Sequence, residues 1–427
     1  MGVDPVEVRE RVAALRAGLP APDVCAHVRN VVIVASSSRG GSSILAEVLR
    51  RVPGLVHLRA EMNPQLRLFG CAGEESDAVS PNHPIPPGLS QALGADCGRP
   101  TDALPDSAVP AFAAEIAARL VVQWPTFHVE HAPVLADVRA TLASLRAAGW
   151  PADRFVDAPS FYALLFRRFC ARWPSFHPAA YDLDRLRVAG LGPAGPFLPL
   201  CPVEEPPFVL PLPWLHATEP ELARLPLVIK TPGNVYRLPW LARLFPHARL
   251  RVLHLTRNPA ASINGLVDGW TYPGFHSHDA GGLSIAGYSA EVAGGDRWWK
   301  FDRPPGWETM RRARLEQVCA FQWASAHRAI LAHAPADRHV LRFEDVVGAP
   351  ERQAAAMRAL SAWLGLADPD ELVGVLRSGL PLVMATEQPR HRRWFTRIDT
   401  LEPLCAEPLV SETRAALGYP DNPAEWE

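Results

Sequence analysis

A short apolar run near the start of the chain passes directly into a loop of small residues and then into a helix. Residues 30–36 are NVVIVAS, a run rich in β-branched side chains that predicts a buried strand. The loop from Ser36, with the sequence SSSRGGSSIL, surrounds one arginine with serines and glycines. Residues 42–51 have the apolar spacing of an amphipathic helix. A strand, a tight loop and a helix in this order predict an α/β fold with a parallel sheet.

The same alternation returns in the second half of the chain. Residues 227–230 (LVIK) and 251–256 (RVLHLT) predict two more strands, with a helix between them over 235–245. The second of these strands opens into RNPAAS and another helix. Further strands are predicted at 55–58 and 339–343, and further helices at 308–333 and 351–365.

Two insertions interrupt the alternation. Residues 70–220 are rich in proline and glycine and predict a helical lid, and residues 269–307 are rich in glycine, histidine and tryptophan. We therefore expect one domain over residues 1–427, with a parallel sheet flanked by helices and two insertions. Helices are expected within the first insertion near 110–122, 136–148 and 160–173.

The composition narrows the classes of function. A chain of 427 residues with 48% hydrophobic and 21% charged residues can bury the core of a globular enzyme. The net charge is −2 with the signs interspersed, so no basic face for a nucleic acid is expected. No run approaches the roughly 18 apolar residues of a membrane span. Seven scattered cysteines without a CxxC pair predict neither a metal site nor a disulfide framework, and we expect a cytoplasmic protein.

The loop after the first strand has the composition of an anion site. Small residues let the backbone approach a ligand, and the following helix N-terminus points free N–H groups at it. Arg39 adds a formal charge, and Ser42 and Ser43 add hydroxyl donors. The alternative is a helix cap after a flexible turn, which serines often supply. The loop contains neither GxxxxGK followed by Ser or Thr nor GxGxxG, which argues against ATP or NAD binding.

This loop resembles the phosphosulfate-binding loop of the sulfotransferases, which use 3′-phosphoadenosine 5′-phosphosulfate (PAPS). Arg39 lies at the basic position of that family, Gly41 at its glycine, and Ser42 and Ser43 at its hydroxyl pair. Gly40 replaces the usual serine and Ile44 an aromatic residue, which favours the bacterial and carbohydrate branches. The resemblance implies a P-loop-like core at residues 30–62, 226–268 and 315–420.

A second anion site is implied by the strand end RVLHLT followed by Arg257. In the family, such an arginine and a helix serine bind the 3′-phosphate of the nucleotide. The family serine position holds Gly265 here, and Ser262 lies one helical turn earlier. The late basic loop with Arg390 and Arg392 resembles the family's loop beside the nucleotide, or is a solvated basic loop. The resemblance implies nucleotide binding by Ser38, Arg39, Gly40, Gly41, Ser42, Ser43, Arg257, Ser262, Arg393 and Trp394.

Sulfuryl transfer to a hydroxyl needs a base and a cation at the leaving oxygen. The family signature places Lys230, one of only two lysines in the chain, beside Arg39 in stabilising the leaving phosphate. Pro232 stands where cytosolic members have a histidine base. Glu61 follows Arg39 by 22 residues, as in the glutamate-base branch, and we expect it to be the base. Two alternatives stay open: Glu61 pairs with a neighbouring arginine, or His276 or His278 is the base.

The second insertion, residues 269–307, predicts an acceptor pocket. Aromatic side chains on a mobile segment suit stacking on a sugar or aromatic acceptor, and they equally suit a lid that packs on the core. Arg297 and Lys300 are candidates for holding an acidic group. The acceptor class remains open among small molecules, lipids and carbohydrates, as does the oligomeric state. The candidate acceptor residues are Trp270, His276, His278, Trp298 and Trp299.

Two other functions compete with a PAPS-dependent sulfotransferase that releases adenosine 3′,5′-bisphosphate. One is a catalytically inactive protein that binds PAPS or another nucleotide. The other is a P-loop-like kinase, but the lysine of a Walker motif is missing from the loop. The three differ in turnover and in the nucleotide bound.

Overall fold

A seven-stranded sheet forms the centre of the molecule in the computed structural model, which describes residues 3–73, 75–181 and 203–426. Within this part of the chain, the strand order is β4-β3-β2-β5-β1-β6-β9. Strand β1 lies between β5 and β6 and pairs with both in parallel. The strands are β1 Asn30–Ala35, β2 Val56–Leu58, β3 Cys97–Pro100, β4 Trp214–His216, β5 Leu227–Lys230, β6 Arg249–Thr256 and β9 Arg338–Arg342.

The parallel core confirms the predicted fold class. Strands β2, β5, β1, β6 and β9 run parallel, so their carboxyl ends meet at one edge of the sheet. The other edge differs from the prediction, because β3 and β4 from the segment 70–220 extend the sheet antiparallel. Neither strand has the apolar, β-branched run that marked the core strands: β3 is CGRP and β4 is WLH. Their pairing depends on the neighbouring strand β2 rather than on a local pattern.

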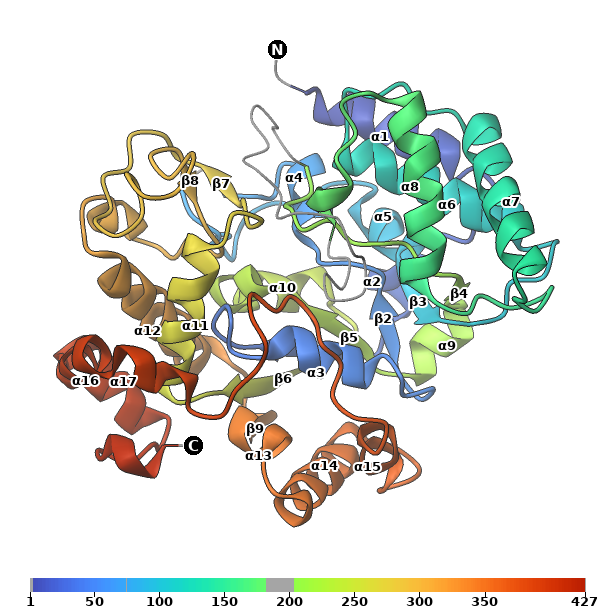
Figure 1. Cartoon of the computed structure of the whole chain (residues 1–427). Helices are drawn as coiled ribbons and strands as arrows, with labels where there is room; N and C mark the ends of the chain where they lie inside the picture. The colour runs from blue at the N-terminus through green and yellow to red at the C-terminus, as the bar shows by residue number, and fades with distance from the viewer. Residues whose placement is uncertain (1–2, 74, 182–202, 427) are drawn as a thin grey trace.

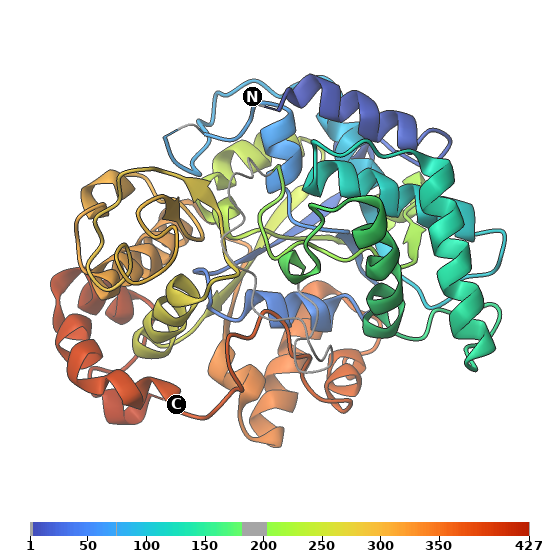
Figure 2. The same cartoon turned by 45° about the horizontal axis from the view of Figure 1, so that its top comes forward.

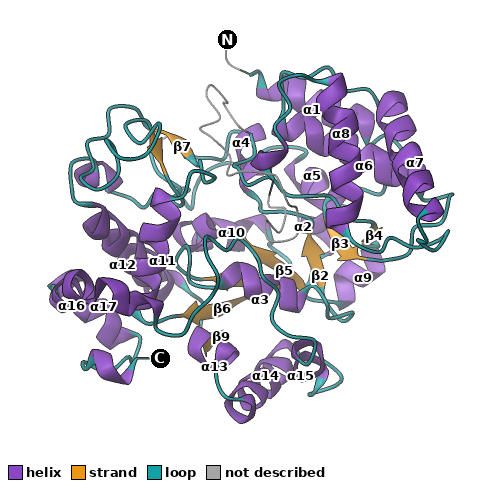
Figure 3. Cartoon of the chain, viewed as in Figure 1, coloured by secondary structure: helices purple, strands orange, loops and turns teal. Residues whose placement is uncertain are grey.

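Helices cover both faces of the sheet (Figures 1 and 3). Alternate residues of β1 face opposite sides: Val31 and Ile33 pack with α10 and α12, while Val32 and Val34 pack with α3 and α14. This alternation is the two-residue period of a strand that is buried on both faces. These helices are α3 Ser42–Leu49, α10 Leu238–Leu244, α12 Leu315–His333 and α14 Pro350–Leu364.

The segment 70–220 builds a helical cluster beside the sheet (Figure 2). Its helices α6 Val109–Gln123, α7 His131–Ala147 and α8 Ala158–Arg172 pack with α1 Pro5–Leu15 around a separate hydrophobic core. The three helices expected in this segment are therefore present. The predicted helix 308–333 begins only at Leu315, after a short 3-10 turn at Trp307–Met310.

The remaining elements connect these layers or follow the core. No helix in the described residues is long and apolar enough to cross a bilayer. Helix α11 Pro259–Thr271 follows β6 and precedes the aromatic segment, by which we mean residues 269–307. The others are α2 Val24–His27, α4 Asn63–Leu68, α5 Leu89–Ala95, α9 Glu219–Arg224, α13 Phe343–Val347, α15 Glu371–Leu376, α16 Ile398–Ala406 and α17 Pro408–Ala416, with the two-residue strands β7 His278–Asp279 and β8 Trp298–Trp299.

Candidate functional site

A cleft of about 630 Å³ opens at the carboxyl edge of the parallel strands. The loop after β1, the end of β5, and the first residue after β6 all line it, as expected for ligands of α/β sheets. The chain between α15 and α16 passes over α3 on the same side (Figure 1). Most of the residues that the sequence predicted to bind or act on the nucleotide or acceptor line it: Ser38, Arg39, Gly41, Ser42, Ser43, Glu61, Lys230, Arg257, His278, Arg390, Arg392, Arg393 and Trp394.

The Ser36–Ser43 loop has a conformation that requires its glycines. Gly41 has a φ of 99° and caps α3, and a β-carbon there would lie 2.3 Å from the Phe343 ring. A β-carbon on Gly40 would lie 2.9 Å from the carbonyl oxygen of Ser37. Arg39 also has a positive φ, at 62°. The loop therefore holds its backbone against the cleft wall at the N-terminus of α3, which is the geometry of an anion site.

Arg257 brings a partly buried cation to the cleft. Its guanidinium lies 4.8 Å from the centre of the Phe343 ring and donates to the carbonyl oxygen of Arg39 at 3.4 Å. Burial lowers the pKa of Arg257, and no carboxylate of the described residues lies within ion-pair distance of it. A partly buried cation without a carboxylate partner favours an anionic ligand.

The turn that carries Arg257 is fixed by Glu344. The Glu344 carboxylate accepts from the Asn258 backbone at 2.8 Å, from the Asn258 side chain at 3.0 Å, and from the Tyr419 hydroxyl at 2.9 Å. Asn258 in turn caps α11. These contacts set the direction in which Arg257 leaves β6.

The late basic loop is anchored to α11. Asp268 forms ion pairs with Arg393 and with Arg397, the second at 2.7 Å. Burial lowers the pKa of Arg393, and Trp394 beside it is buried. The loop predicted to lie near the nucleotide thus lines the same cleft as Arg257.

Lys230 and Glu61 form an ion pair in the cleft. The Lys230 ammonium donates to the Glu61 carboxylate at 2.5 Å, and 15% and 32% of the two side chains are exposed. Both residues follow strand ends, β5 and β2. Thr231 joins them further, because its hydroxyl accepts from the Met62 backbone N–H at 2.8 Å. Glu61 therefore pairs with Lys230, and not with a neighbouring arginine as one alternative had it.

Arg39 is held by carbonyl oxygens at the cleft, and Ser262 lies away from the cleft. The Arg39 guanidinium donates to the carbonyl oxygens of Met384 at 2.7 Å and Gly265 at 3.3 Å, and it lies over the Phe275 ring. Ser262 is fully buried in α11 and does not line the cleft. Gly40 also lies behind the wall of the cleft, buried by its own loop.

The tryptophans of the aromatic segment lie in the hydrophobic core. Trp270 and Trp299 pack edge to face at 5.1 Å, and Trp298, also buried, lies against the His276 ring. None of the three lines the cleft, an arrangement that matches a lid packed on the core. His276 is buried as well, and burial lowers its pKa to about 4.

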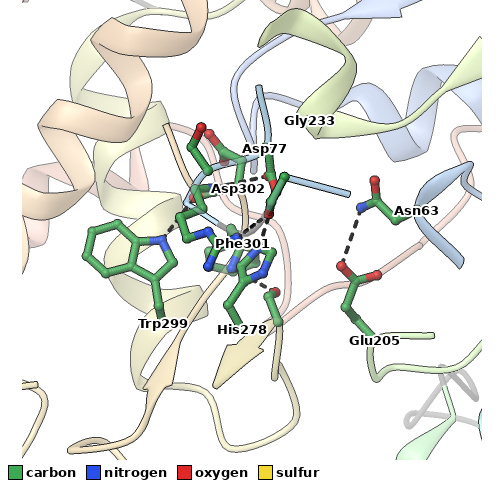
Figure 4. A network of polar contacts seen from close by, with 12 residues as sticks. Asn63, Asp77, Glu205, Gly233, His278, Trp299, Phe301 and Asp302 are labelled. Atoms are coloured by element: carbon green, nitrogen blue, oxygen red, sulfur yellow. Dashed lines mark hydrogen bonds and ion pairs between the residues drawn. The ribbon is translucent and has the colours of Figure 1, made fainter. Parts of the chain in front are cut away.

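The residues of the segment that do reach the cleft carry other side chains. His278 lines it and lies 3.6 Å from the Asp77 carboxylate, and burial lowers the His278 pKa to about 4. Phe275 and Phe301 line it with Ser277. Asp77, His278 and Phe301 form one group, and across from them Asn63 donates to Glu205 (Figure 4). This part of the wall presents hydrogen-bonding groups and apolar faces to the cleft.

Asp302 is a cleft residue that sequence reasoning missed. It is buried, lines the cleft, and accepts hydrogen bonds from the Ser38 and Tyr236 hydroxyls at 2.5 and 2.6 Å. Burial raises its pKa to about 6, against the two hydrogen bonds, which lower it. No motif marks Asp302, because its partners lie 264 and 66 positions away.

Comparison with known proteins gives distant structural similarities alone. No protein-family model matches the sequence, and no curated protein matches it. The chain is similar to a sulfotransferase domain from the curacin biosynthetic pathway, with 11% identity, 92% of this chain and 99% of that chain covered, and a TM-score of 0.38. It is also similar to sulfotransferase STF9 from Mycobacterium avium, with 12% identity, 98% and 84% covered, and a TM-score of 0.38.

A third solved structure is the sulfotransferase domain of the Synechococcus PCC 7002 olefin synthase. It shares 11% identity with this chain, covers 94% of it and 98% of its own length, and has a TM-score of 0.32. The solved structures named here are all sulfotransferases, and none superimposes closely.

Proposed function

We propose that this chain is a sulfotransferase that moves the sulfuryl group of PAPS to a hydroxyl of a small-molecule, lipid or carbohydrate acceptor. One observation carries the proposal. A glycine- and serine-rich loop, a partly buried arginine without a carboxylate partner, and a lysine–carboxylate pair line a single cleft at neighbouring strand ends. Each feature alone has a structural explanation, but their convergence in one cleft would supply two anion sites and a base for the transfer.

The donor would lie along the wall formed by the loop, Arg257 and the late basic loop. The N-terminus of α3 and the Ser42 and Ser43 hydroxyls would bind the phosphosulfate end. Arg257 would bind the 3′-phosphate, since its partly buried guanidinium forms no ion pair with a carboxylate of the described residues. Arg393 and Trp394 would contact the adenosine, with the indole offering a stacking face.

The transfer step uses the Lys230–Glu61 pair. The acceptor hydroxyl oxygen forms a bond to sulfur while the bond from sulfur to the phosphate oxygen breaks. Glu61 takes the hydroxyl proton, and the electron pair of the broken bond stays on the phosphate of adenosine 3′,5′-bisphosphate. Lys230 has three N–H donors, so it can hold Glu61 and the departing oxygen together. Positioning and charge stabilisation supply most of the acceleration in related phosphoryl transfers.

A base role for His278 fits the geometry less well than one for Glu61. His278 already faces the Asp77 carboxylate, whereas Glu61 is held beside the cation expected at the leaving oxygen. Both line the cleft, so substitution is the way to separate them.

The test is turnover of PAPS by wild type and by Glu61→Gln. Release of adenosine 3′,5′-bisphosphate would be followed by chromatography with a panel of sugars, phenols and simple alcohols as acceptors. We expect wild-type turnover and a loss of about 10²–10⁴-fold in Glu61→Gln, with bisphosphate affinity unchanged. His278→Gln is the matched comparison. Binding without turnover in wild type would instead support an inactive PAPS-binding protein, and phosphate transfer from ATP would support a kinase.

A further inference from the structure

Residues Phe301–Arg303 form a sharp corner in the wall of the cleft, next to the Ser36–Ser43 loop. Phe301 has a φ of 63°, which is rare and strained for a residue with a β-carbon. Such a conformation persists only where surrounding contacts determine it. The contacts around Phe301 therefore fix the backbone at this point.

Buried hydrogen bonds hold this corner from several directions (Figure 4). The Phe301 backbone N–H donates to the Ser277 hydroxyl at 2.9 Å. The Asp302 carbonyl oxygen accepts from the Trp299 indole at 3.0 Å and from the Gln322 amide at 2.7 Å. The Arg303 N–H donates to the Asp77 carboxylate at 3.0 Å. The corner is consequently a rigid point of the cleft wall.

The Asp302 side chain joins this rigid point to two other elements. Its Oδ1 accepts from the Ser38 hydroxyl at 2.5 Å, and Ser38 belongs to the loop. Its Oδ2 accepts from the Tyr236 hydroxyl at 2.6 Å, and Tyr236 ends the 3-10 turn that follows Lys230. One carboxylate thus connects the aromatic segment, the anion loop and the end of β5.

A carboxylate at this position is costly in two ways. Burial disfavours its charge, which raises its pKa to about 6, and a negative group beside an anion site weakens anion binding. The charged neighbours do not remove that cost, because Asp77 adds a like charge. The geometric contribution of Asp302 is the remaining explanation for its presence.

We propose that Asp302 is a positioning residue that fixes the anion loop through Ser38. The rigid corner holds Asp302, Asp302 holds the Ser38 hydroxyl, and the loop then keeps its N–H groups directed at the phosphosulfate. Ser38 contributes its backbone to the donor site, because its hydroxyl proton is engaged by Asp302. The inference rests on the proposed function and adds a residue that the family resemblance does not include.

A role as general base fits Asp302 less well. Both of its oxygens already accept a hydroxyl hydrogen bond, one from the loop and one from the core. Asn keeps the size of Asp and one acceptor oxygen for Ser38, and its amide can donate to the Tyr236 hydroxyl. The Asn variant therefore separates positioning from proton transfer.

The experiment measures the Kd of adenosine 3′,5′-bisphosphate and PAPS turnover in Asp302→Ala, Asp302→Asn, Ser38→Ala and the double variant Ser38→Ala/Asp302→Ala. We expect Asp302→Ala and Ser38→Ala to lower kcat/KM for PAPS by about ten- to hundredfold, as loop misplacement does. Asp302→Asn should retain turnover within about threefold. The double variant should lose no more than either single variant, because one hydrogen bond joins the pair.

Tyr236→Phe keeps the measurement informative if Asp302→Ala does not fold, since it removes one hydroxyl and should lower turnover by about threefold. Asp296→Ala, an exposed carboxylate of the same segment, is the control and should match wild type. Wild-type turnover in Asp302→Ala would overturn the inference. So would a loss of turnover in the double variant that equals the product of the two single losses, or a loss in Asp302→Asn as large as that in Asp302→Ala. A wild-type protein that neither binds the bisphosphate nor consumes PAPS would instead overturn the proposed function.

Discussion

The two walls of the cleft are built in different ways. The donor wall consists of strand ends and the loop at the start of α3, where the backbone conformation of Gly41 and the direction of Arg257 set the geometry. The opposite wall includes residues of the aromatic segment together with Asn63 and Asp77, and side-chain hydrogen bonds hold its corner at Phe301–Arg303 in place. Backbone geometry therefore defines the proposed donor site, whereas long-range polar contacts define the proposed acceptor side.

This difference teaches where substitutions should act. Changes in the donor wall should alter nucleotide binding and turnover while the rest of the fold stays intact. Changes in the aromatic segment should first alter stability, because its tryptophans fill the core. Asp302 lies where the two walls meet and should affect both.

The largest expected effect belongs to the core of the aromatic segment. Trp298→Ala removes a fully buried ring and should lower the free energy of unfolding by about 3–5 kcal/mol. The affinity for adenosine 3′,5′-bisphosphate at low temperature should not change. Chemical denaturation checks the first point and calorimetry the second. Trp150 is a half-buried tryptophan of the helical cluster, and Trp150→Ala should lower the free energy of unfolding by less. Unchanged stability of Trp298→Ala would instead place the Trp298 ring on the acceptor surface.

Lys230→Ala tests the donor wall at the leaving oxygen. Removing one preorganised donor at a developing charge typically costs about 10²–10³-fold in kcat, or roughly 3–4 kcal/mol. We expect that loss in PAPS turnover, with folding retained. Lys230→Arg keeps the charge, and its turnover should lie between those of wild type and Lys230→Ala. Full turnover in Lys230→Ala would contradict the role that we give to the lysine.

Asp302→Asn should change how the free energy of unfolding depends on pH. The folded pKa of about 6 exceeds the ordinary 3.8, so the acid form stabilises the fold below pH 4 and that stability is lost as pH rises to 6. The difference corresponds to at most about 3 kcal/mol. Asp302→Asn should therefore be more stable than wild type above pH 6 and equal to it near pH 4. Urea unfolding at both values measures this, and a less stable variant at pH 7.5 would refute it.

The smallest expected effect is at the loop glycine. Gly41→Ala requires a strained φ and displaces the Phe343 ring, which should cost about 2 kcal/mol and weaken bisphosphate binding. Gly365→Ala is the matched control, because its φ is 79° in open space at the end of α14. Gly365→Ala should lower the free energy of unfolding by about 1 kcal/mol without a change in bisphosphate binding. Equal binding by both variants would mean that the loop does not contact the nucleotide.

The contrast between the walls also explains what the sequence could predict. The strands β1, β5 and β6 and the loop between β1 and α3 follow from local apolar runs and small residues, so they were predicted correctly. Strands β3 and β4 were not predicted, because they depend on pairing with β2. Asp302 depends on partners 264 and 66 positions away, and Trp270 on a partner 52 positions away, and local patterns do not report such contacts.

The central claim is that this cleft binds a nucleotide with phosphates at both ends. Thermal unfolding with adenosine 3′,5′-bisphosphate, AMP, ATP or NADH tests it in wild type, in Arg257→Ala, and in the exposed control Arg224→Ala. We predict stabilisation by the bisphosphate, about 2.7 kcal/mol at one hundred times its Kd. AMP should stabilise the protein less than the bisphosphate does. This difference should disappear in Arg257→Ala and persist in wild type and in Arg224→Ala. Stabilisation by ATP with none by the bisphosphate would contradict the account.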